Sequence, residues 1–487
     1  MQGRSGATLL TGFVLLLALL SVLLRFQLLR ARPLWFDELF TFWAARLPLR
    51  ELIDALRRDS GPPGFYLLEK PFALLADRAP NGDAWLRVPS FVAGLGLLWC
   101  APTLASKVAR GFFVLLVSGF TLVNLYAAEA RAYAPLGLLA LVLFVLALRG
   151  EESLRRLAAT AAVAALALDM HYLGLFVLAA LLLLAARARR WRSCGALLLG
   201  GAVFLPWIPI LRAQPAAAIA WVHESAGASA AGVLSALGGV GRVPAAFGTP
   251  PPPALFLAAA AAGIACLTLL LDVARRDRDA AEAAAFVLLV LAGVAASGLV
   301  RPVLFPGRTE MAVLPVWIWG LASAIRSSRA LRVAGGAAAA LGFVATFGLA
   351  RQARTASPPV YVAVAESVSR AAEPGDAVLA AGSFYLPARL ASERGQLVAP
   401  VHALPAELSE HPGWFVPALP GRAEEDLLAR TLAAVPPGGR LFLVLPAPYQ
   451  TEGVNRVLNG AGGDARALIR SRDAAVTLWT PRRPAIP

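Results

Sequence analysis

The chain has 487 residues, of which 58% are hydrophobic and only 15% are charged. Soluble domains are about 45–50% apolar and about 25% charged, so this composition excludes an ordinary soluble protein and indicates a chain embedded mostly in lipid. The formal net charge of +15 is carried by short basic clusters between apolar segments rather than by one basic run. Such clusters are typical of the cytoplasmic loops of membrane proteins, so we expect membrane lipids, and no nucleic acid, as partners.

Apolar segments of roughly 18–20 residues can cross a bilayer as helices, because lipid offers no hydrogen-bond partner to free backbone groups. The sequence predicts about eleven such helices before the C-terminal region. We expect the first of them to be retained, because no small-residue cleavage site follows a short apolar core. The expected spans are residues 8–29, 86–106, 111–127, 133–148, 157–171, 173–186, 195–213, 253–272, 281–300, 311–325 and 333–350.

The distribution of arginine predicts the orientation of these helices. With the N-terminus inside, the arginine-rich loops face the cytoplasm, and the lightly charged turns near 128–132 and 171–172 face the outer side. The same topology places two larger segments outside: residues 30–85 and a Gly/Ala/Pro-rich loop, 214–252, which we expect to be mobile. The arginine-rich loops are residues 107–110, 149–156, 187–194, 273–280 and 326–332.

The region after about residue 355 has a different pattern. The short runs "DAVLAAG", "RLFLVLP" and "AAVTLW" are typical of strands, and helical or Pro/Gly-rich segments separate them. This alternation predicts a small α/β domain. The expected fold is therefore an α-helical polytopic membrane protein with a small extracytoplasmic α/β domain at its C-terminus. The predicted domains are 1–352, which includes the outer loop 30–85, and 353–487.

Charged side chains at a membrane boundary are expensive unless they are paired, hydrated or functional. The predicted topology brings several of them, from distant parts of the chain, to the same outer level. Asp37 and Glu38 follow the first span, "YAAEARAY" and "DMHY" each join two helices, and "RPVLFPGRTE" forms a further outer turn. We interpret this convergence as the main functional signal of the sequence.

Six stretches of the chain stand out: "LWFDELFTFWAA", "SGPPGFYLLEK", "WLRVPSFVAGL", "YAAEARAYAPLGLLAL", "HYLGLFVL" and "RPVLFPGRTEMAVLP". Together they resemble the GT-C superfamily of membrane glycosyltransferases. The similarity is to the bacterial branch related to protein O-mannosyltransferases and the lipid A aminoarabinose transferase, of the glycosyltransferase family 39 type, and it covers about the first two thirds of the chain. Gly61-Pro62-Pro63 stands where relatives often have His-Pro-Pro, and Gly307-Arg308-Thr309 where they often have Pro-Arg-Tyr.

The resemblance implies an enzyme of the bacterial inner membrane with its active site on the extracytoplasmic side. Its donor would be a hexose or pentose on polyprenyl phosphate, and its acceptor a lipid, glycan or protein. An acceptor hydroxyl needs a carboxylate to take its proton, and the departing lipid phosphate needs a cation to stabilise its charge. One carboxylate acting as base predicts inversion at the anomeric carbon, by analogy with inverting hydrolases.

The resemblance and this chemistry together assign roles to residues. The expected catalytic residues are Asp37, Glu38 and Glu129. Asp37 is the general base, Glu38 orients Asp37 or meets an arginine rather than acting as base, and Glu129 is a second acid. Arg131 is the first choice for the phosphate, because arginine can grip phosphate oxygens in a bidentate manner. Some GT-C enzymes use a divalent cation, which Asp37 and Glu129 could hold, but we assign no metal. The expected substrate-binding residues are Arg131, Tyr133, Lys70, His171 and Arg308.

Each assignment has a structural alternative. Asp37 and Glu38 would also suit the first turn of an interfacial helix, where the helix dipole favours acids. Glu129 and Arg131 could form an ordinary salt bridge in a turn, and His171 could be a satisfied residue at a helix end. The alternative function is a transporter or flippase of a lipid-linked cell-envelope intermediate. Such transporters place charges at mid-membrane and often have duplicated halves, and this sequence shows neither feature.

Overall fold

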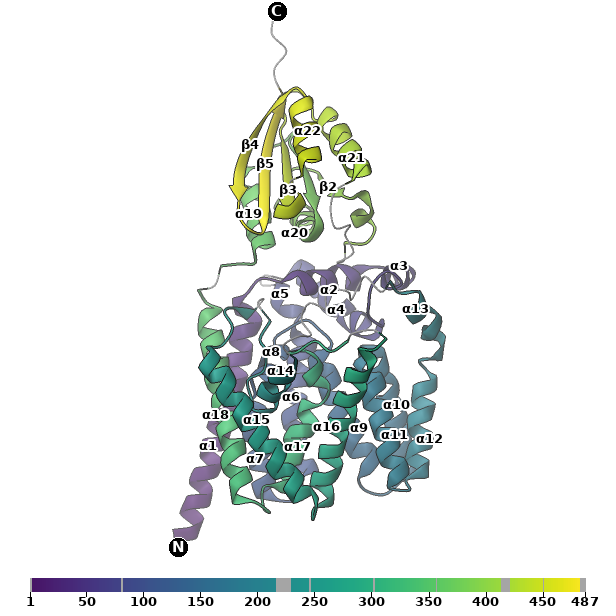
Figure 1. Ribbon diagram of the computed structural model, residues 1–487, viewed down its shortest axis with the longest axis vertical. Helices are drawn as coiled ribbons and strands as arrows, with labels where there is room; N and C mark the ends of the chain where they lie inside the picture. Colours follow the sequence, from purple (N-terminus) through teal and green to yellow (C-terminus); the bar gives the residue numbers. More distant parts are fainter. Residues whose placement is uncertain are drawn as a thin grey trace, which may run out of the picture. The chain divides into compact units, whose positions relative to one another are not determined.

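The computed structural model describes residues 2–79, 82–215, 229–244, 247–300, 303–355, 357–412, 421–449 and 451–481 (Figure 1). Its contacts divide the chain into two compact units. We call them the helical unit, Met1–Arg32 with Ser60–Ala356, and the α/β unit, Pro33–Asp59 with Ser357–Pro487. The fold is therefore mainly helical with a small C-terminal sheet, as the sequence predicts.

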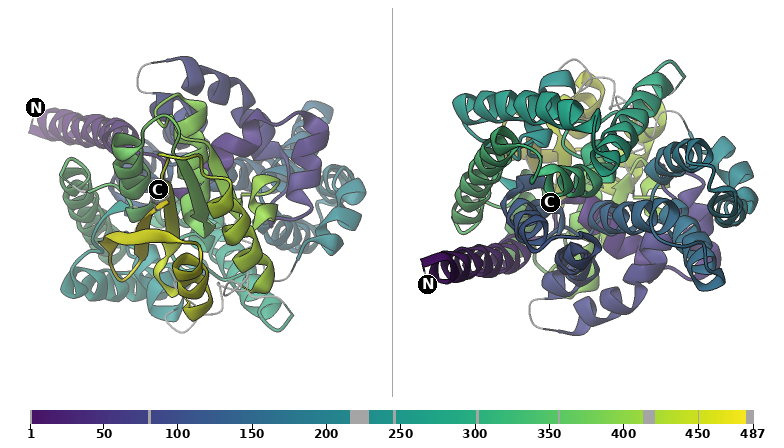
Figure 2. Two further views of the ribbon diagram at one scale, coloured as in Figure 1. Left: turned by 90° about the horizontal axis from the view of Figure 1, so that it is seen from above. Right: turned by 90° about the horizontal axis from the view of Figure 1, so that it is seen from below.

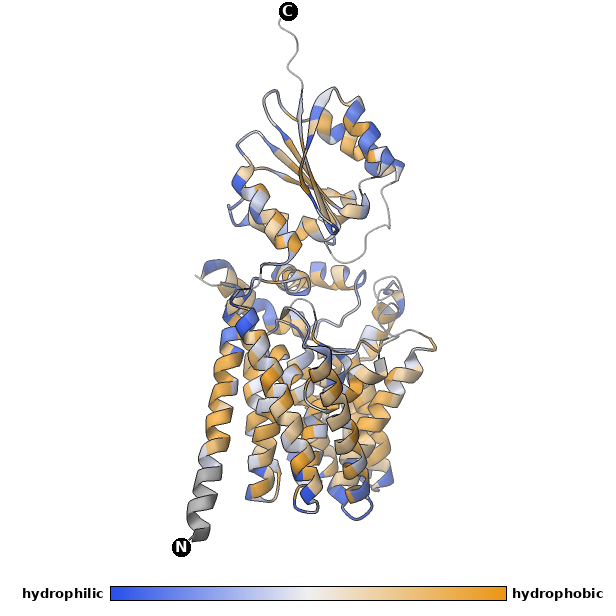
Figure 3. Ribbon diagram, turned by 60° about the vertical axis from the view of Figure 1, so that its left-hand side comes forward, coloured by the Kyte–Doolittle hydropathy of each residue, from blue (hydrophilic) through white to orange (hydrophobic). Residues whose placement is uncertain are grey.

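The helical unit contains a helix within each of the eleven expected spans. Its helices are apolar along most of their length and hydrophilic near their ends (Figure 3). Among the described residues, five helical segments are long and apolar enough to cross a membrane. They are Thr11–Ala31, Trp191–Ala213, Pro253–Ala274, Arg278–Ser297 and Arg329–Gln352, and Figure 2 shows the first at the edge of the bundle. The helices of the unit are α1 (Gln2–Ala31), α4 (Gly64–Arg78), α5 (Gly82–Trp85), α6 (Val88–Trp99), α7 (Lys107–Gly119), α8 (Thr121–Tyr126), α9 (Tyr133–Leu148), α10 (Leu154–Met170), α11 (Leu173–Arg187), α12 (Trp191–Ala202), α13 (Ile208–Ala213), α14 (Ser229–Leu237), α15 (Pro253–Ala274), α16 (Arg278–Ser297), α17 (Leu314–Ala324) and α18 (Arg329–Gln352).

One expected span is interrupted by a polar network in the apolar interior. The segment 111–127 breaks at Phe120 into α7 and α8, and the Asn124 amide nitrogen donates to the carbonyls of Ser118 and Phe120, both at 2.9 Å. The Asn124 carbonyl oxygen accepts from Arg25 Nε at 2.7 Å. Arg25 is fully buried and also donates to two backbone carbonyls. The break persists in this apolar setting because these side chains satisfy the freed backbone groups.

The segment 214–252, expected to be a mobile loop, contains a packed helix instead. Residues 216–228 and 245–246 of it lie outside the described residues, but α14 packs closely on α15. Trp317 Nε1 donates to the carbonyl of Leu237 at 2.9 Å, and Leu237 is buried. The expectation was wrong here because small residues, which suggest low complexity, let helix backbones approach closely. A Cβ on Gly263 would lie 2.0 Å from the carbonyl oxygen of Leu234.

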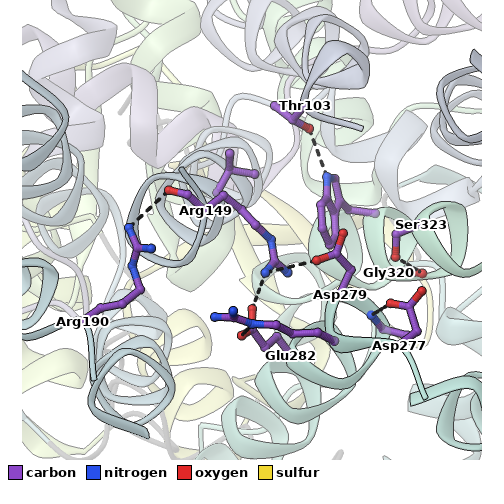
Figure 4. Close-up of polar contacts among 12 residues, drawn as sticks. Thr103, Arg149, Arg190, Asp277, Asp279, Glu282, Gly320 and Ser323 are labelled. Carbon is purple, nitrogen blue, oxygen red and sulfur yellow. Dashed lines mark hydrogen bonds and ion pairs between the residues drawn. The ribbon is translucent and has the colours of Figure 1, made fainter. Parts of the chain in front are cut away.

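A second polar cluster lies at the end of α9 opposite Tyr133 (Figure 4). Arg149 forms ion pairs with Glu282 and with Asp279, the latter at 3.2 Å, and Arg190 donates to the carbonyl of Ala147 at 2.8 Å. The predicted loops 149–156, 187–194 and 273–280 therefore share one end of the bundle, as the arginine pattern predicts. About 24 Å of helix separates this cluster from the turn before α9, at about 1.5 Å per residue.

The α/β unit is a five-stranded sheet with helices on both faces. The strand order is β2-β1-β3-β5-β4, with β2, β1 and β3 parallel and β5 antiparallel to both β3 and β4. The three runs predicted from sequence are β1, β3 and β5. Its elements are α2 (Phe36–Arg46), α3 (Leu49–Leu56), α19 (Val360–Ala371), β1 (Ala377–Ala381), α20 (Tyr385–Glu393), β2 (Val401–Leu404), α21 (Arg422–Ala433), β3 (Leu441–Pro446), α22 (Glu452–Gly460), β4 (Gly463–Arg470) and β5 (Ala474–Pro481).

The two faces of the sheet have separate apolar cores. Val378, Phe442 and Val444 face a cluster that includes α19 and α20, whereas Leu379 and Leu443 face one that includes α21 and α22. Alternate side chains of a strand point to opposite faces, so fully buried strands need apolar residues at every position. The contacts of α2 and α3 place these helices in this unit. From sequence they are predicted to belong to the membrane domain, with the rest of 30–85. The domain boundary at 352/353 stays a prediction.

Candidate active site

The acids Asp37 and Glu38 lie in the first turn of α2. Trp35 precedes the helix in an extended conformation, and its backbone N–H donates to Glu38 Oε2 at 3.3 Å. Glu38 therefore caps the helix, as the structural alternative for this residue suggests. Asp37 is only 2% exposed, and its backbone carbonyl accepts from the Thr41 hydroxyl at 2.9 Å. The catalytic roles of both acids stay predictions.

In the helical unit, Glu129 and Arg131 occupy a tight turn between α8 and α9. The Arg131 N–H donates to the Glu129 carbonyl at 2.8 Å, and Ser90 Oγ donates to the Arg131 carbonyl at 3.0 Å. Glu129 is fully buried. Arg32, whose Nη2 donates to the Ala128 carbonyl at 3.0 Å, holds the same turn from the end of α1. The two residues lie in an irregular turn rather than on one helix face, as their spacing of two predicts.

Aromatic rings flank this turn and connect it with the next one. The rings of Tyr126 and Tyr133 have centroids 4.9 Å apart, and the His171 ring packs on Tyr133 at 5.2 Å. His171 Nδ1 accepts from the Leu173 N–H at 3.1 Å, so the ring proton of neutral His171 lies on Nε2. Burial, and then the charges of Arg131 and Arg308, lower the pKa of His171 to about 3. The imidazole is therefore neutral at physiological pH, and Nε2–H can donate a hydrogen bond.

Arg308 reaches the same cluster from the turn before α17. Its guanidinium lies over the Tyr133 ring at 5.9 Å and over the Phe305 ring at 4.6 Å. Gly307 has a φ of +92°, and a Cβ there would lie 2.1 Å from the carbonyl oxygen of Arg242. Proline cannot adopt a positive φ. This turn therefore requires glycine at position 307, where the Pro-Arg-Tyr motif would have proline. Tyr126 Oη donates to the Gly307 carbonyl and so links the two turns.

Glu310 and Tyr126 are parts of this site that sequence reasoning did not select. Glu310 is fully buried and its Oε2 accepts from the Gly307 N–H at 2.8 Å, but Oε1 has no hydrogen-bond partner among the described residues. Burial raises the pKa of Glu310 to about 7. Their positions in the sequence could have indicated both residues. Glu310 lies two residues after Arg308, and Tyr126 is the first residue of "YAAEARAY". An acid beside an arginine reads from sequence as an ion pair, and a tyrosine at a helix end as an interfacial residue.

The structure thus brings together four predicted substrate-binding residues: Arg131, Tyr133, His171 and Arg308. The fifth, Lys70, lies on α4 directly after the buried Glu69, and its role stays a prediction. Among the residues that the structure describes, no three His, Cys, Asp or Glu side chains gather where they could hold an ion.

The architecture of a helical bundle with a small C-terminal α/β domain is shared with solved structures, which confirms the expected fold class. The chain is similar to two crystal structures of ArnT from Cupriavidus metallidurans. The apo structure gives a TM-score of 0.60, and the structure bound to undecaprenyl phosphate gives 0.61. Each match is 12% identical in sequence and covers 96% of this chain and 98% of that chain. A scan against protein-family models found no match, and a search of curated proteins found none.

Proposed function

We propose that this protein is an integral-membrane glycosyltransferase that moves a sugar from polyprenyl phosphate to an acceptor hydroxyl. The observation that carries the proposal is the convergence of two arginines, Arg131 and Arg308, on neutral His171, whose ring packs on Tyr133. Three donors of this kind at the end of an apolar bundle suit a lipid-borne phosphate. The similarity in fold to an ArnT structure that holds undecaprenyl phosphate supports the same donor class.

In the proposed reaction, the acceptor oxygen attacks the anomeric carbon of the sugar from the face opposite the phosphate. Asp37 takes the hydroxyl proton, and the bond from the anomeric carbon to the phosphate oxygen breaks. The configuration at the anomeric carbon is thereby inverted. Arg131 and Arg308 stabilise the charge that grows on the phosphate, and His171 Nε2–H donates to it. Lys70 supplies further positive charge, and Glu129 acts as a second acid. We place the reaction on the extracytoplasmic face of a bacterial inner membrane.

Donor binding should weaken as Glu310 ionises. Its carboxyl group, with a pKa of about 7, lies in the turn that presents Arg308. Below pH 7 the group is neutral, and above pH 7 its negative charge repels the donor phosphate. We therefore expect KM for the donor to rise about 10-fold between pH 6 and pH 8, following the fraction of ionised carboxylate. Initial rates across this range provide the measurement.

Glu310→Gln is the control for this pH dependence. Glutamine keeps an oxygen that can accept from the Gly307 N–H but cannot ionise, so KM should become nearly constant across the range. A wild-type KM that does not change with pH, or a dependence that survives in Glu310→Gln, would contradict the role given to this carboxyl group.

A panel of donors tests the proposed function. Purified protein is incubated with polyprenyl phosphates that carry different hexoses or pentoses, together with an extract of envelope lipids and glycans as acceptors. We expect at least one donor to yield free polyprenyl phosphate and a glycosylated acceptor. Movement of intact donor across a membrane, with no cleavage of any donor, would instead support a flippase.

A further inference from the structure

The helix that carries Asp37 is anchored at its beginning by a residue more than 300 positions away. The backbone N–H of Phe36, the first residue of α2, donates to Tyr361 Oη at 2.9 Å. The two rings also pack edge to face with centroids 6.2 Å apart. Tyr361 lies in the first turn of α19, where the C-terminal α/β region begins. The peptide immediately before Asp37 is therefore held by that region.

Further contacts attach the rest of α2 to the same region. Arg46, at the end of the helix, forms an ion pair with Glu393 at 2.7 Å, and the Arg394 guanidinium lies over the Phe42 ring at 5.0 Å. Between the two ends, the buried His411 ring packs on Phe40 at 5.5 Å. These partners come from α20, from the residue that follows it and from the segment after β2, so separate parts of the α/β fold hold one short helix.

The Tyr361 contact also meets a need that α2 cannot meet by itself. The first N–H groups of a helix have no acceptor within the helix, and an unsatisfied buried N–H is costly. Phe36 is only 2% exposed, so its N–H requires a partner from elsewhere in the protein, and the Tyr361 hydroxyl provides one. Because this bond ends on the residue before Asp37, it fixes the direction in which the helix presents its first acid.

We propose that Tyr361 is a positioning residue for sugar transfer and that the C-terminal domain is the scaffold that orients α2. This inference rests on the proposed function, in which Asp37 is the general base. A base must lie within hydrogen-bond reach of the proton that it takes, and an error of 1 Å in position can cost about 100-fold in rate. The domain thus contributes to the chemical step by holding the base in position.

The variant Tyr361→Phe tests the inference, because it keeps the ring contact with Phe36 and removes only the hydroxyl acceptor. We expect kcat to fall about 10-fold while KM for the donor stays within about twofold, since donor binding does not depend on Asp37. Tyr449→Phe is the matched control. Tyr449 belongs to the same domain but packs in the core on the other face of the sheet, and its variant should keep wild-type kcat.

Hydrogen exchange gives a second readout that does not depend on activity. In Tyr361→Phe, the peptide that spans the start of α2 should exchange faster, with the exchange of β1 and β3 unchanged. Faster exchange in all of these elements would mean general unfolding and would overturn the inference. The inference would also be overturned if Tyr361→Phe kept wild-type kcat while Asp37→Asn was inactive. That result would leave the proposed function intact. If wild-type protein cleaves no donor, the proposed function fails. Hydrogen exchange then still tests whether Tyr361 anchors the start of α2.

Discussion

Asp37→Asn is expected to abolish sugar transfer while the protein folds and inserts normally. Asparagine is nearly the same size as aspartate but cannot accept a proton from the acceptor hydroxyl. General-base catalysis typically contributes about 100- to 10,000-fold to a rate, so kcat should fall by that order and KM for the donor should change little. The measurement is the rate of polyprenyl phosphate release at saturating donor, with folding followed by size-exclusion profile and thermal unfolding.

Asp54→Asn is the matched control for this substitution. Asp54 lies on α3 in the same unit, is about half exposed, and pairs at 3.7 Å with Arg57, the residue that follows this helix. An exposed pair of this kind contributes about 0–1 kcal/mol to the free energy of unfolding, so the control should retain activity. If Asp37→Asn and Asp54→Asn are equally active, Asp37 is not the base.

The second large effect is expected at Arg308. Its guanidinium is 8% exposed and lies over two aromatic rings, in a setting where charge on a departing phosphate is poorly stabilised by water. Removing one such donor typically costs about 100- to 1,000-fold in kcat, or about 2.7–4 kcal/mol of transition-state stabilisation. We expect this loss for Arg308→Gln. Arg308→Lys should recover only part of the activity, because lysine keeps the charge but loses the two-pronged geometry.

A control variant, Arg276→Gln, distinguishes the loss of kcat expected for Arg308→Gln from the effect of removing any positive charge. Arg276→Gln removes an exposed arginine after α15, near the end of the bundle that carries Arg149, and should leave kcat unchanged. Arg308→Gln with normal turnover, in protein whose thermal unfolding matches wild type, would show that Arg308 stabilises no reacting group.

Much of the helical unit could be predicted from hydropathy, because lipid imposes one requirement on every span: its backbone must be satisfied internally. What hydropathy did not reveal were the exceptions to that requirement. The break at Phe120 depends on the side chain of Asn124, and Asn124 depends on Arg25, about 100 positions away. The helix α14 was missed because its packing depends on small residues, which carry little hydropathic signal. Both features arise from contacts between distant segments.

The sheet shows the same limit. The buried strands β1, β3 and β5 are apolar runs and could be found. The edge strand β4, "GDARALIR", contains charged residues and is mostly exposed, and β2 has only four residues. Such strands are defined by the neighbour with which they pair more than by their own composition.

The candidate site could be predicted in part, because helix counting brings the outer turns to one level. That reasoning selected Arg131, Tyr133, His171 and Arg308, which the structure gathers in one cluster. It did not reveal the protonation state of His171, or that Glu310 Oε1 has no hydrogen-bond partner in the part of the chain that the structure describes, since both depend on burial. Nor did it connect α2 with the C-terminal domain, because a bond between Phe36 and Tyr361 leaves no local trace in the sequence.

Cleavage of a single labelled donor in proteoliposomes tests the central claim most directly. A polyprenyl phosphate carrying a radiolabelled sugar is reconstituted with wild-type protein and with Asp37→Asn, and both the lipid products and the side of the membrane that the sugar faces are followed. The account predicts that wild-type protein breaks the bond between sugar and phosphate, with the label passing to an acceptor, and that Asp37→Asn does not. Label that changes sides while still attached to the lipid, equally in both proteins, would contradict it.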